Sequence, residues 1–221
     1  MKRNRKNIIA SVCLLIAFIL WTTTVCFVDV KQIGPQGSSV GLAGINQFVH
    51  DLTGVHFLLY HITDWLGLVP FGICGIFGVL GLVQWIKRKS ICKVDSSILV
   101  LGGFYLVTIA VYLLFENVVI NYRPVLIEGV LEVSYPSSTT MLTMCVMPTA
   151  IMQCNDRIKN QKIRKVISGA MWAFTVFMVI GRLVSGVHWV SDIVGGALLS
   201  AGLVMMYTFM ADACCDSSVI L

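Results

Sequence analysis

The segment between the last two apolar stretches of the chain reads Arg182-Leu-Val-Ser-Gly-Val-His188-Trp-Val-Ser-Asp192. It places an arginine, a histidine and an aspartate beside long apolar segments, where ionisable groups are costly and usually functional. On a helix, the i, i+4 spacing of His188 and Asp192 would put both side chains on one face. The carboxylate could then orient the imidazole beside a guanidinium group, an arrangement suited to attack on a phosphoryl group.

Apolar residues dominate the composition of the chain. Of its 221 residues, 57% are hydrophobic and only 12% are charged, and the mean hydropathy is +0.86. A soluble domain of this length cannot bury so much apolar surface, so the predicted solvent is a lipid bilayer. Six apolar segments are long enough, or nearly so, to cross about 30 Å of hydrocarbon as helices. We therefore expect an all-α integral membrane protein with six transmembrane helices over residues 8–28, 67–86, 97–115, 138–154, 166–183 and 189–210.

Positive charges gather on one predicted side of the bilayer. The N-terminus and alternate connections hold 13 of the 16 basic residues: Lys2, Arg3, Arg5, Lys6, Lys87, Arg88, Lys89, Lys93, Arg157, Lys159, Lys162, Arg164 and Lys165. Because basic loops stay in the cytoplasm, both termini are predicted to be cytoplasmic. The net charge of +5 then reflects membrane topology, and no nucleic-acid partner is expected.

The expected organisation has five parts. Residues 1–28 form a basic cytoplasmic N-terminus and the first transmembrane helix, whose apolar run is longer than that of a cleaved signal peptide. There follow an outer loop with an interfacial helix (29–66), the second helix with a cytoplasmic loop (67–96), a core of four helices (97–210) and a cytoplasmic tail (211–221). The eight cysteines show no paired spacing, so neither a disulfide framework nor a zinc site is expected.

Three of the four histidines lie in the predicted outer loop. Residues 45–65 are apolar on more than one face, which predicts an interfacial helix anchored by Tyr60 and Trp65. This stretch carries His50, His56 and His61. Their spacings of six and five residues do not place them on one helix face. We therefore interpret them as interfacial side chains and expect no metal site there.

Three short clusters fall on the predicted outer side. They are Glu116-x6-Arg123-Pro124 after the third span, Pro136-Ser137-Ser138-Thr139-Thr140 at the start of the fourth, and Arg182-x5-His188-x3-Asp192 between the last two. Together they resemble the type 2 phosphatidic acid phosphatase and vanadium haloperoxidase-like superfamily. That family's pattern is Lys-x6-Arg-Pro, then Pro-Ser-Gly-His, then Ser-Arg-x5-His-x3-Asp. The resemblance covers roughly residues 97–210 in the expected order, and implies the helical-bundle core of that family.

The resemblance implies a role for each matching residue. His188 would attack phosphorus and form a phosphohistidine, while Asp192 would hold the imidazole in one tautomer and stabilise its positive charge. Guanidinium groups and a helix N-terminus suit the oxygens of a phosphate group. Neither a metal nor another cofactor is implied, and the phosphate-binding residues would be Arg123, Arg182, Ser137 and Ser138.

The chain departs from the family pattern at two functional positions. Glu116 stands in place of the lysine, and Thr139 in place of the second histidine, the general acid that protonates the departing alcohol. Loss of such an acid lowers the rate about 10²–10⁴-fold, which matters most for an alkoxide leaving group. This favours a polyprenyl diphosphate over phosphatidate, whereas a carboxylate at Glu116 would repel a diphosphate. The alternatives are a protonated Glu116, its pairing with Arg123, or a proton donated by Glu128 or Glu132.

Two functions of different classes follow from these residues. The first is an integral-membrane lipid phosphatase that hydrolyses a phosphate ester or diphosphate of a lipid at the outer leaflet, expected in a bacterial plasma membrane. The second is a catalytically weak relative that binds anionic lipid headgroups as a scaffold or transporter-like protein. The His188–Asp192 pair favours the enzyme, because a binding protein needs the arginines but no nucleophile. A haloperoxidase with bound vanadate is a more distant third alternative.

Overall fold

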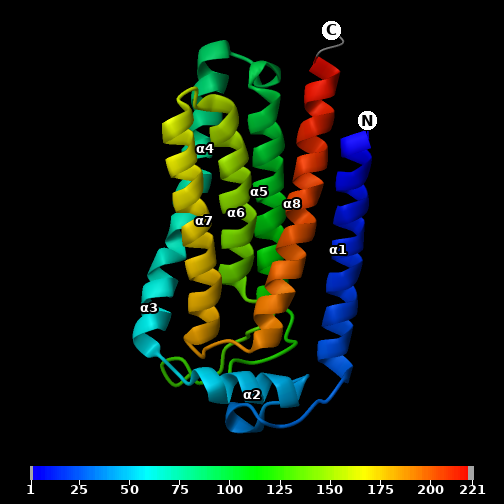
Figure 1. The fold of residues 1–221 in the computed structure, drawn as a ribbon, viewed down its shortest axis with the longest axis vertical. Helices are drawn as coiled ribbons and strands as arrows, with labels where there is room; N and C mark the ends of the chain where they lie inside the picture. The colour runs from blue at the N-terminus through cyan, green and yellow to red at the C-terminus, as the bar shows by residue number, and fades with distance from the viewer. Residues whose placement is uncertain (1, 219–221) are drawn as a thin grey trace.

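The apolar segments form long helices that lie side by side in one bundle (Figure 1). The computed structural model describes residues 2–218. Its helices are α1 (Lys2–Phe27), α2 (Ala43–Thr53), α3 (Phe57–Leu66), α4 (Leu68–Arg88), α5 (Ser96–Glu116), α6 (Ser138–Arg157), α7 (Gln161–Val184) and α8 (Val190–Ser218). Figure 1 shows α2 lying across one end of the bundle and both termini at the other end. The expected tail is helical as far as Ser218, and residues 219–221 lie outside the described residues.

The lengths of the helices match a lipid bilayer. Within residues 2–218, five helical segments are long and apolar enough to cross one: Asn4–Phe27, Phe57–Arg88, Ser96–Glu116, Gln161–Val184 and Val190–Cys214. The remaining expected span, residues 138–154, is α6, which packs against α4, α5, α7 and α8 and buries more than half of its residues. A helix surrounded by protein tolerates polar side chains such as Thr143 and Gln153, which explains its weaker apolar signal. The predicted all-α membrane bundle is confirmed.

The core of the bundle lies where α1, α5, α6 and α8 meet. α1 packs along α8, and Ser11 Oγ donates a hydrogen bond to the carbonyl oxygen of Gly202 at 2.8 Å. The ring of Tyr135 lies against Gly195, where a β-carbon would come within 2.7 Å of it. Glycine at this position therefore lets the segment before α6 approach α8 closely. The side chains that fill this core include Phe18, Leu101, Tyr135, Met141, Cys145 and Tyr207.

The single interfacial helix expected over 45–65 is wrong, because the chain forms two helices there. α2 ends at Thr53, and Gly54 adopts a positive φ of 68°, which breaks the helix. α3 instead continues through Gly67 into α4, so residues 57–88 form one membrane-length segment. Tyr60, expected as an interfacial anchor, is buried inside the protein, whereas Trp65 is 74% exposed.

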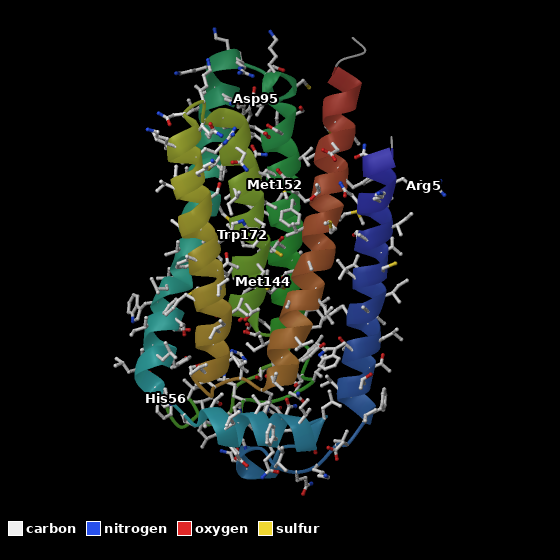
Figure 2. The ribbon with its side chains drawn as sticks, in the orientation of Figure 1. Arg5, His56, Asp95, Met144, Met152 and Trp172 are labelled. Carbon is white, nitrogen blue, oxygen red and sulfur yellow. The ribbon has the colours of Figure 1, made fainter. Side chains whose placement is uncertain are left out.

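The connection between α5 and α6 is folded against the end of the bundle that carries α2 (Figure 1). An isolated antiparallel bridge joins Tyr122 to Val133. Beside it, the backbone amide of Arg123 donates to the carbonyl oxygen of Glu132 at 3.0 Å. The backbone amide of Ser134 donates to the carbonyl oxygen of Asn121 at 2.9 Å. This pairing fixes the positions of Arg123 and Ser134 relative to each other. Figure 2 shows His56 near this end and Arg5 and Asp95 near the opposite end.

Candidate active site

The turn between α7 and α8 carries the histidine of the third motif. Arg182 lies in the last turn of α7, His188 in the turn itself, and Asp192 in the first turn of α8. Gly186 makes the turn possible with a φ of 69°, and a β-carbon there would stand 1.9 Å from the carbonyl oxygen of Gly54. The turn is therefore packed tightly against the segment between α2 and α3.

His188 and Asp192 do not share a helix, because α8 begins only at Val190. The distance between His188 Nδ1 and Asp192 Oδ2 is 3.7 Å, which is longer than a hydrogen bond. Ser134 fills the gap: its hydroxyl lies 3.1 Å from His188 Nδ1 and donates a short hydrogen bond to Asp192 Oδ2. The carboxylate of Asp192 therefore lies near the imidazole, as the sequence predicts, but the hydroxyl of Ser134 makes the hydrogen-bond contact between them.

Donors from three segments surround the carboxylate of Asp192. The amide of Trp189 donates to Oδ2 at 2.9 Å, while Asn121 Nδ2 and Ser191 Oγ each lie 3.4 Å from Oδ1. Asn46 of α2 holds Ser191 in turn, by a hydrogen bond of 2.9 Å to its hydroxyl. A fully buried carboxylate requires such partners, because an unpaired charge is very costly to bury.

Arg182 is buried to 1% exposure and faces α3. Its Nη1 lies 3.5 Å from Asp64 Oδ1 and 3.5 Å from Thr63 Oγ1, while its Nη2 lies 3.4 Å from His188 Nε2. The guanidinium carbon is 5.1 Å from the centre of the Tyr60 ring, which adds a cation–π contact. Residues 60, 63 and 64 lie on one face of α3, so one helix face supplies all three contacts.

Arg123 approaches the same tyrosine from the α5–α6 connection. Its guanidinium carbon lies 5.8 Å from the centre of the Tyr60 ring, and its Nε lies 3.0 Å from Glu132 Oε2. Tyr60 therefore contacts both arginines of the sequence motifs. Three buried polar atoms of the predicted phosphate-binding residues have no hydrogen-bond partner within residues 2–218: Arg123 Nη1, Arg182 Nε and Ser137 Oγ. Unpaired buried polar atoms are uncommon in proteins and call for an explanation such as a ligand, an ion or a water molecule.

A cavity of about 300 Å³ opens beside these residues. Arg123 and His188 lie on its wall together with Glu116, Glu132, Ser134 and Ser138, and the start of α6 faces it. The cavity wall thus combines one guanidinium group, the start of a helix and an imidazole, which suit an oxyanion, with two carboxylates, which do not; Arg182 and Ser137 are not among its lining residues. The remaining wall is formed by Tyr112, Phe115, Val133, Tyr135, Pro136 and Met141.

The imidazole of His188 is held in its neutral form. Burial of the ring lowers its pKa well below the usual value of 6.5, and the charges of Arg123 and Arg182 lower the pKa further. Both effects disfavour a second positive charge in this place. A neutral imidazole keeps one nitrogen lone pair, which nucleophilic attack requires.

The two departures from the family pattern lie in different places. Glu116, the last residue of α5, is exposed at the cavity wall. Thr139 points toward the junction of α3 and α4, with its Cγ2 3.5 Å from where a β-carbon on Gly67 would stand. Of the two alternative proton donors, Glu132 lies on the cavity wall, whereas Glu128 is exposed in the loop.

The three other histidines are not brought into this cluster. His56 and His61 are exposed, and the ring of His50 lies 5.5 Å from that of Trp189. Three residues, Ser134, Tyr60 and Asp64, were not assigned to the site from the sequence, and Glu132 was not paired with Arg123. For Tyr60 and Asp64, the sequence did hold a signal, because the spacing of Tyr60, Thr63 and Asp64 places them on one face of a helix.

Comparison with known proteins shows the family and the fold of the chain. The family model of the PAP2 superfamily matches residues 103–213, half of the chain. A search of curated proteins found no match. Among solved structures, the chain is similar to the first transmembrane PAP2 type phosphatidylglycerolphosphate phosphatase from Bacillus subtilis, with a TM-score of 0.53 and 19% sequence identity over 90% of this chain and 94% of that chain. At this identity the likeness is one of fold, and it is the family match, supported by the common fold, that shows this chain to belong to the PAP2 superfamily.

Proposed function

We propose that this protein is an integral-membrane lipid phosphatase that hydrolyses a phosphate ester or diphosphate of a lipid through a phosphohistidine intermediate. The observation that carries the proposal is the arrangement around His188. Its Nε2 lies 3.4 Å from the buried guanidinium of Arg182, and it shares the cavity wall with Arg123. A protein that only binds phosphate needs the two arginines, but it does not need a neutral, oriented imidazole between them and a carboxylate.

The proposed reaction has two steps. In the first, the Nε2 lone pair of His188 forms a bond to phosphorus while the bond from phosphorus to the leaving oxygen breaks, and the leaving oxygen takes a proton. In the second, water attacks the phosphohistidine, the phosphorus–nitrogen bond breaks, and inorganic phosphate is released. Arg123 and Arg182 would hold the phosphate oxygens, and Ser137 with the start of α6 at Ser138 would complete the oxyanion site.

The leaving oxygen limits the choice of substrate. Thr139 cannot supply a proton near neutral pH and points toward Gly67. The carboxyl group of Glu132 lies on the cavity wall, but it is paired with Arg123 at 3.0 Å until a phosphate displaces it. A diphosphate releases a phosphate monoester, which departs with little protonation, so we propose that a polyprenyl-type diphosphate turns over faster than an alkyl phosphate such as phosphatidate.

The proposed location of the reaction is the outer leaflet of the membrane. The cavity is lined by the end of α5, the α5–α6 connection and the start of α6, and Figure 1 shows this connection at the end of the bundle that carries α2, opposite to both termini. The 13 basic residues of the N-terminus and alternate connections favour a cytoplasmic position for those termini. A lipid headgroup from the outer leaflet would then reach the cavity without crossing the bilayer.

Phosphate release by purified protein in detergent tests this proposal. The substrates are phosphatidate, phosphatidylglycerol phosphate and a polyprenyl diphosphate, and the variants are His188→Asn and the matched control His61→Asn on the exposed face of α3. We expect release by the wild type and by the control, and only background release by His188→Asn. Saturable lipid binding without release from any substrate would favour the alternative, an anionic-lipid-binding protein. Full activity of His188→Asn would overturn the mechanism.

A further inference from the structure

Ser134 lies between the histidine and the aspartate of the third motif. It is 3% exposed and belongs to the segment before α6, whereas His188 and Asp192 belong to the α7–α8 turn and to α8. Its hydroxyl lies within hydrogen-bond distance of both side chains. The direct approach of the two, 3.7 Å, is too long for a hydrogen bond.

The donors and acceptors around His188 can be assigned from their chemistry. A guanidinium has only donors, so Arg182 Nη2 faces an imidazole nitrogen that carries a lone pair, which is Nε2. The Ser134 hydroxyl has one proton, and an ionised Asp192 can only accept it. The lone pair of the serine oxygen is then left for a proton on His188 Nδ1 at 3.1 Å. Both assignments give the same tautomer, with the proton on Nδ1 and the lone pair on Nε2.

We propose that Ser134 is the positioning residue that connects Asp192 to His188 and fixes the tautomer of the histidine. This inference rests on the proposed function for its catalytic meaning, since it is the Nε2 lone pair that would attack phosphorus. As the Nε2–phosphorus bond forms, the ring becomes positive. The Nδ1 proton stays on the ring, and the Ser134 oxygen, polarised by Asp192, stabilises that charge without any proton being transferred.

The backbone around Ser134 is built to hold it in this place. Its amide donates to the carbonyl of Asn121 at 2.9 Å, and the side chain of Asn121 lies 3.4 Å from Asp192 Oδ1. The same pairing of segments holds Arg123 beside Glu132. The α5–α6 connection thus positions both Arg123 and Ser134, the serine that contacts His188. A serine needed only for packing would not require a hydroxyl directed at two functional groups.

The direct test is the tautomer of His188, which does not depend on finding a substrate. Protein with ¹⁵N-labelled histidine rings is compared by NMR in detergent micelles as wild type, Ser134→Ala and His188→Asn, the last to assign the His188 signals. We expect the Nδ1–H tautomer in the wild type, and a mixture of tautomers or a shifted equilibrium in Ser134→Ala. An Nε2–H tautomer in the wild type, or an unchanged His188 spectrum in Ser134→Ala, would overturn the inference.

Once a substrate is known, the kcat and KM of Ser134 variants provide a second test of this role. Loss of a group that orients a functional histidine typically lowers activity about 10–100-fold, so we expect kcat of Ser134→Ala to fall by that factor with KM nearly unchanged. Ser134→Thr keeps the hydroxyl and should recover part of the rate. The control is Ser200→Ala, which removes a buried hydroxyl of α8 that bonds to the backbone carbonyls of Met141 and Gly196, away from His188 and Asp192. It should keep the wild-type kcat.

The outcomes separate this inference from the proposed function. An inactive wild type with the expected tautomer change would reject the phosphatase and keep the role of Ser134 in orienting His188. An active wild type whose kcat and histidine spectrum are both unaffected by Ser134→Ala would keep the phosphatase and reject that role. A lowered unfolding temperature in Ser134→Ala without a change in kcat or tautomer would assign the serine to folding alone.

Discussion

The two arginines of the site are both shielded from water, and each is paired with one partly exposed carboxylate. Arg182 lies 3.5 Å from Asp64, and Arg123 lies 3.0 Å from Glu132. Burying a guanidinium costs several kcal/mol unless partners compensate for the lost water, so the protein keeps these charges at a substantial cost. The pairs leave Arg182 Nε and Arg123 Nη1 without a hydrogen-bond partner, and in the proposed function these donors would bind the oxygens of a phosphate group.

The exposed carboxylate of Glu116 places a negative charge at the cavity wall, where a phosphate group is proposed to bind. We expect Glu116→Lys to bind inorganic phosphate more tightly than the wild type, because it replaces a negative charge at the cavity wall with a positive one. Glu128→Lys makes the same change of charge in the exposed loop and serves as the control. The inhibition constant for phosphate measures the effect. Equal inhibition of both variants would mean that position 116 does not face the phosphate.

The protonation of His188 gives a prediction about pH. Burial and the charges of Arg123 and Arg182 hold the pKa of His188 well below 6.5, so the neutral nucleophile persists as the pH falls below 6.5. We expect the acid limb of kcat/KM to lie below pH 6.5. In Arg123→Gln the pKa should rise because one positive charge is gone, and the acid limb should move to higher pH. A limb that stays in place would show that another group controls it.

The helices of the site are held by two close contacts made at glycines, one with backbone at Gly186 and one with the ring of Tyr135 at Gly195. The α7–α8 turn reaches the segment between α2 and α3 at Gly186, and the segment before α6 reaches α8 at Gly195. The amide of His56 also donates to the carbonyl of Ser185 at 3.0 Å, which ties the α3 start to the same turn. These contacts set the distance from Arg182 to its partners on α3.

Gly186→Ala should damage both stability and activity. A side chain at a φ of 69° costs about 1 kcal/mol or more, and the added β-carbon would lie 1.9 Å from the Gly54 carbonyl. We expect a lower unfolding temperature and a loss of activity larger than the loss of folded protein. Gly169→Ala in α7, where a β-carbon meets open space, is the control. Equal unfolding temperatures of the two variants would contradict the close approach.

The elements were largely predictable from sequence, and the contacts of the site were not. The spans at 97–115 and 166–183 appear as helices Ser96–Glu116 and Gln161–Val184, since apolar length is a local property of the chain. The break at Gly54 was missed because residues 45–65 are apolar across it. The role of Ser134 depends on pairing with segments more than fifty residues away, for which sequence spacing holds no signal.

The bundle holds its basic N-terminus and its basic connections at the end opposite to its cavity, whereas Arg123 lies on the cavity wall itself. Both termini lie at one end, and α2 with the cavity-forming connections lies at the other (Figure 1). An outer position for the cavity predicts that Glu128→Cys reacts with a membrane-impermeant maleimide on intact cells, in a variant without native cysteines. Lys162→Cys should react only after lysis. The reverse pattern would place the cavity on the cytoplasmic side.

The most direct measurement of the central claim is capture of the phosphoenzyme. Wild type and His188→Asn are mixed with a substrate carrying ³²P in its transferred phosphate and are quenched in alkali after times from milliseconds to seconds. The account predicts label on the wild-type chain that survives alkali, is lost in acid as a phosphorus–nitrogen bond is, and is absent from His188→Asn. Turnover without any labelled protein, or label that survives acid or remains in His188→Asn, would contradict it.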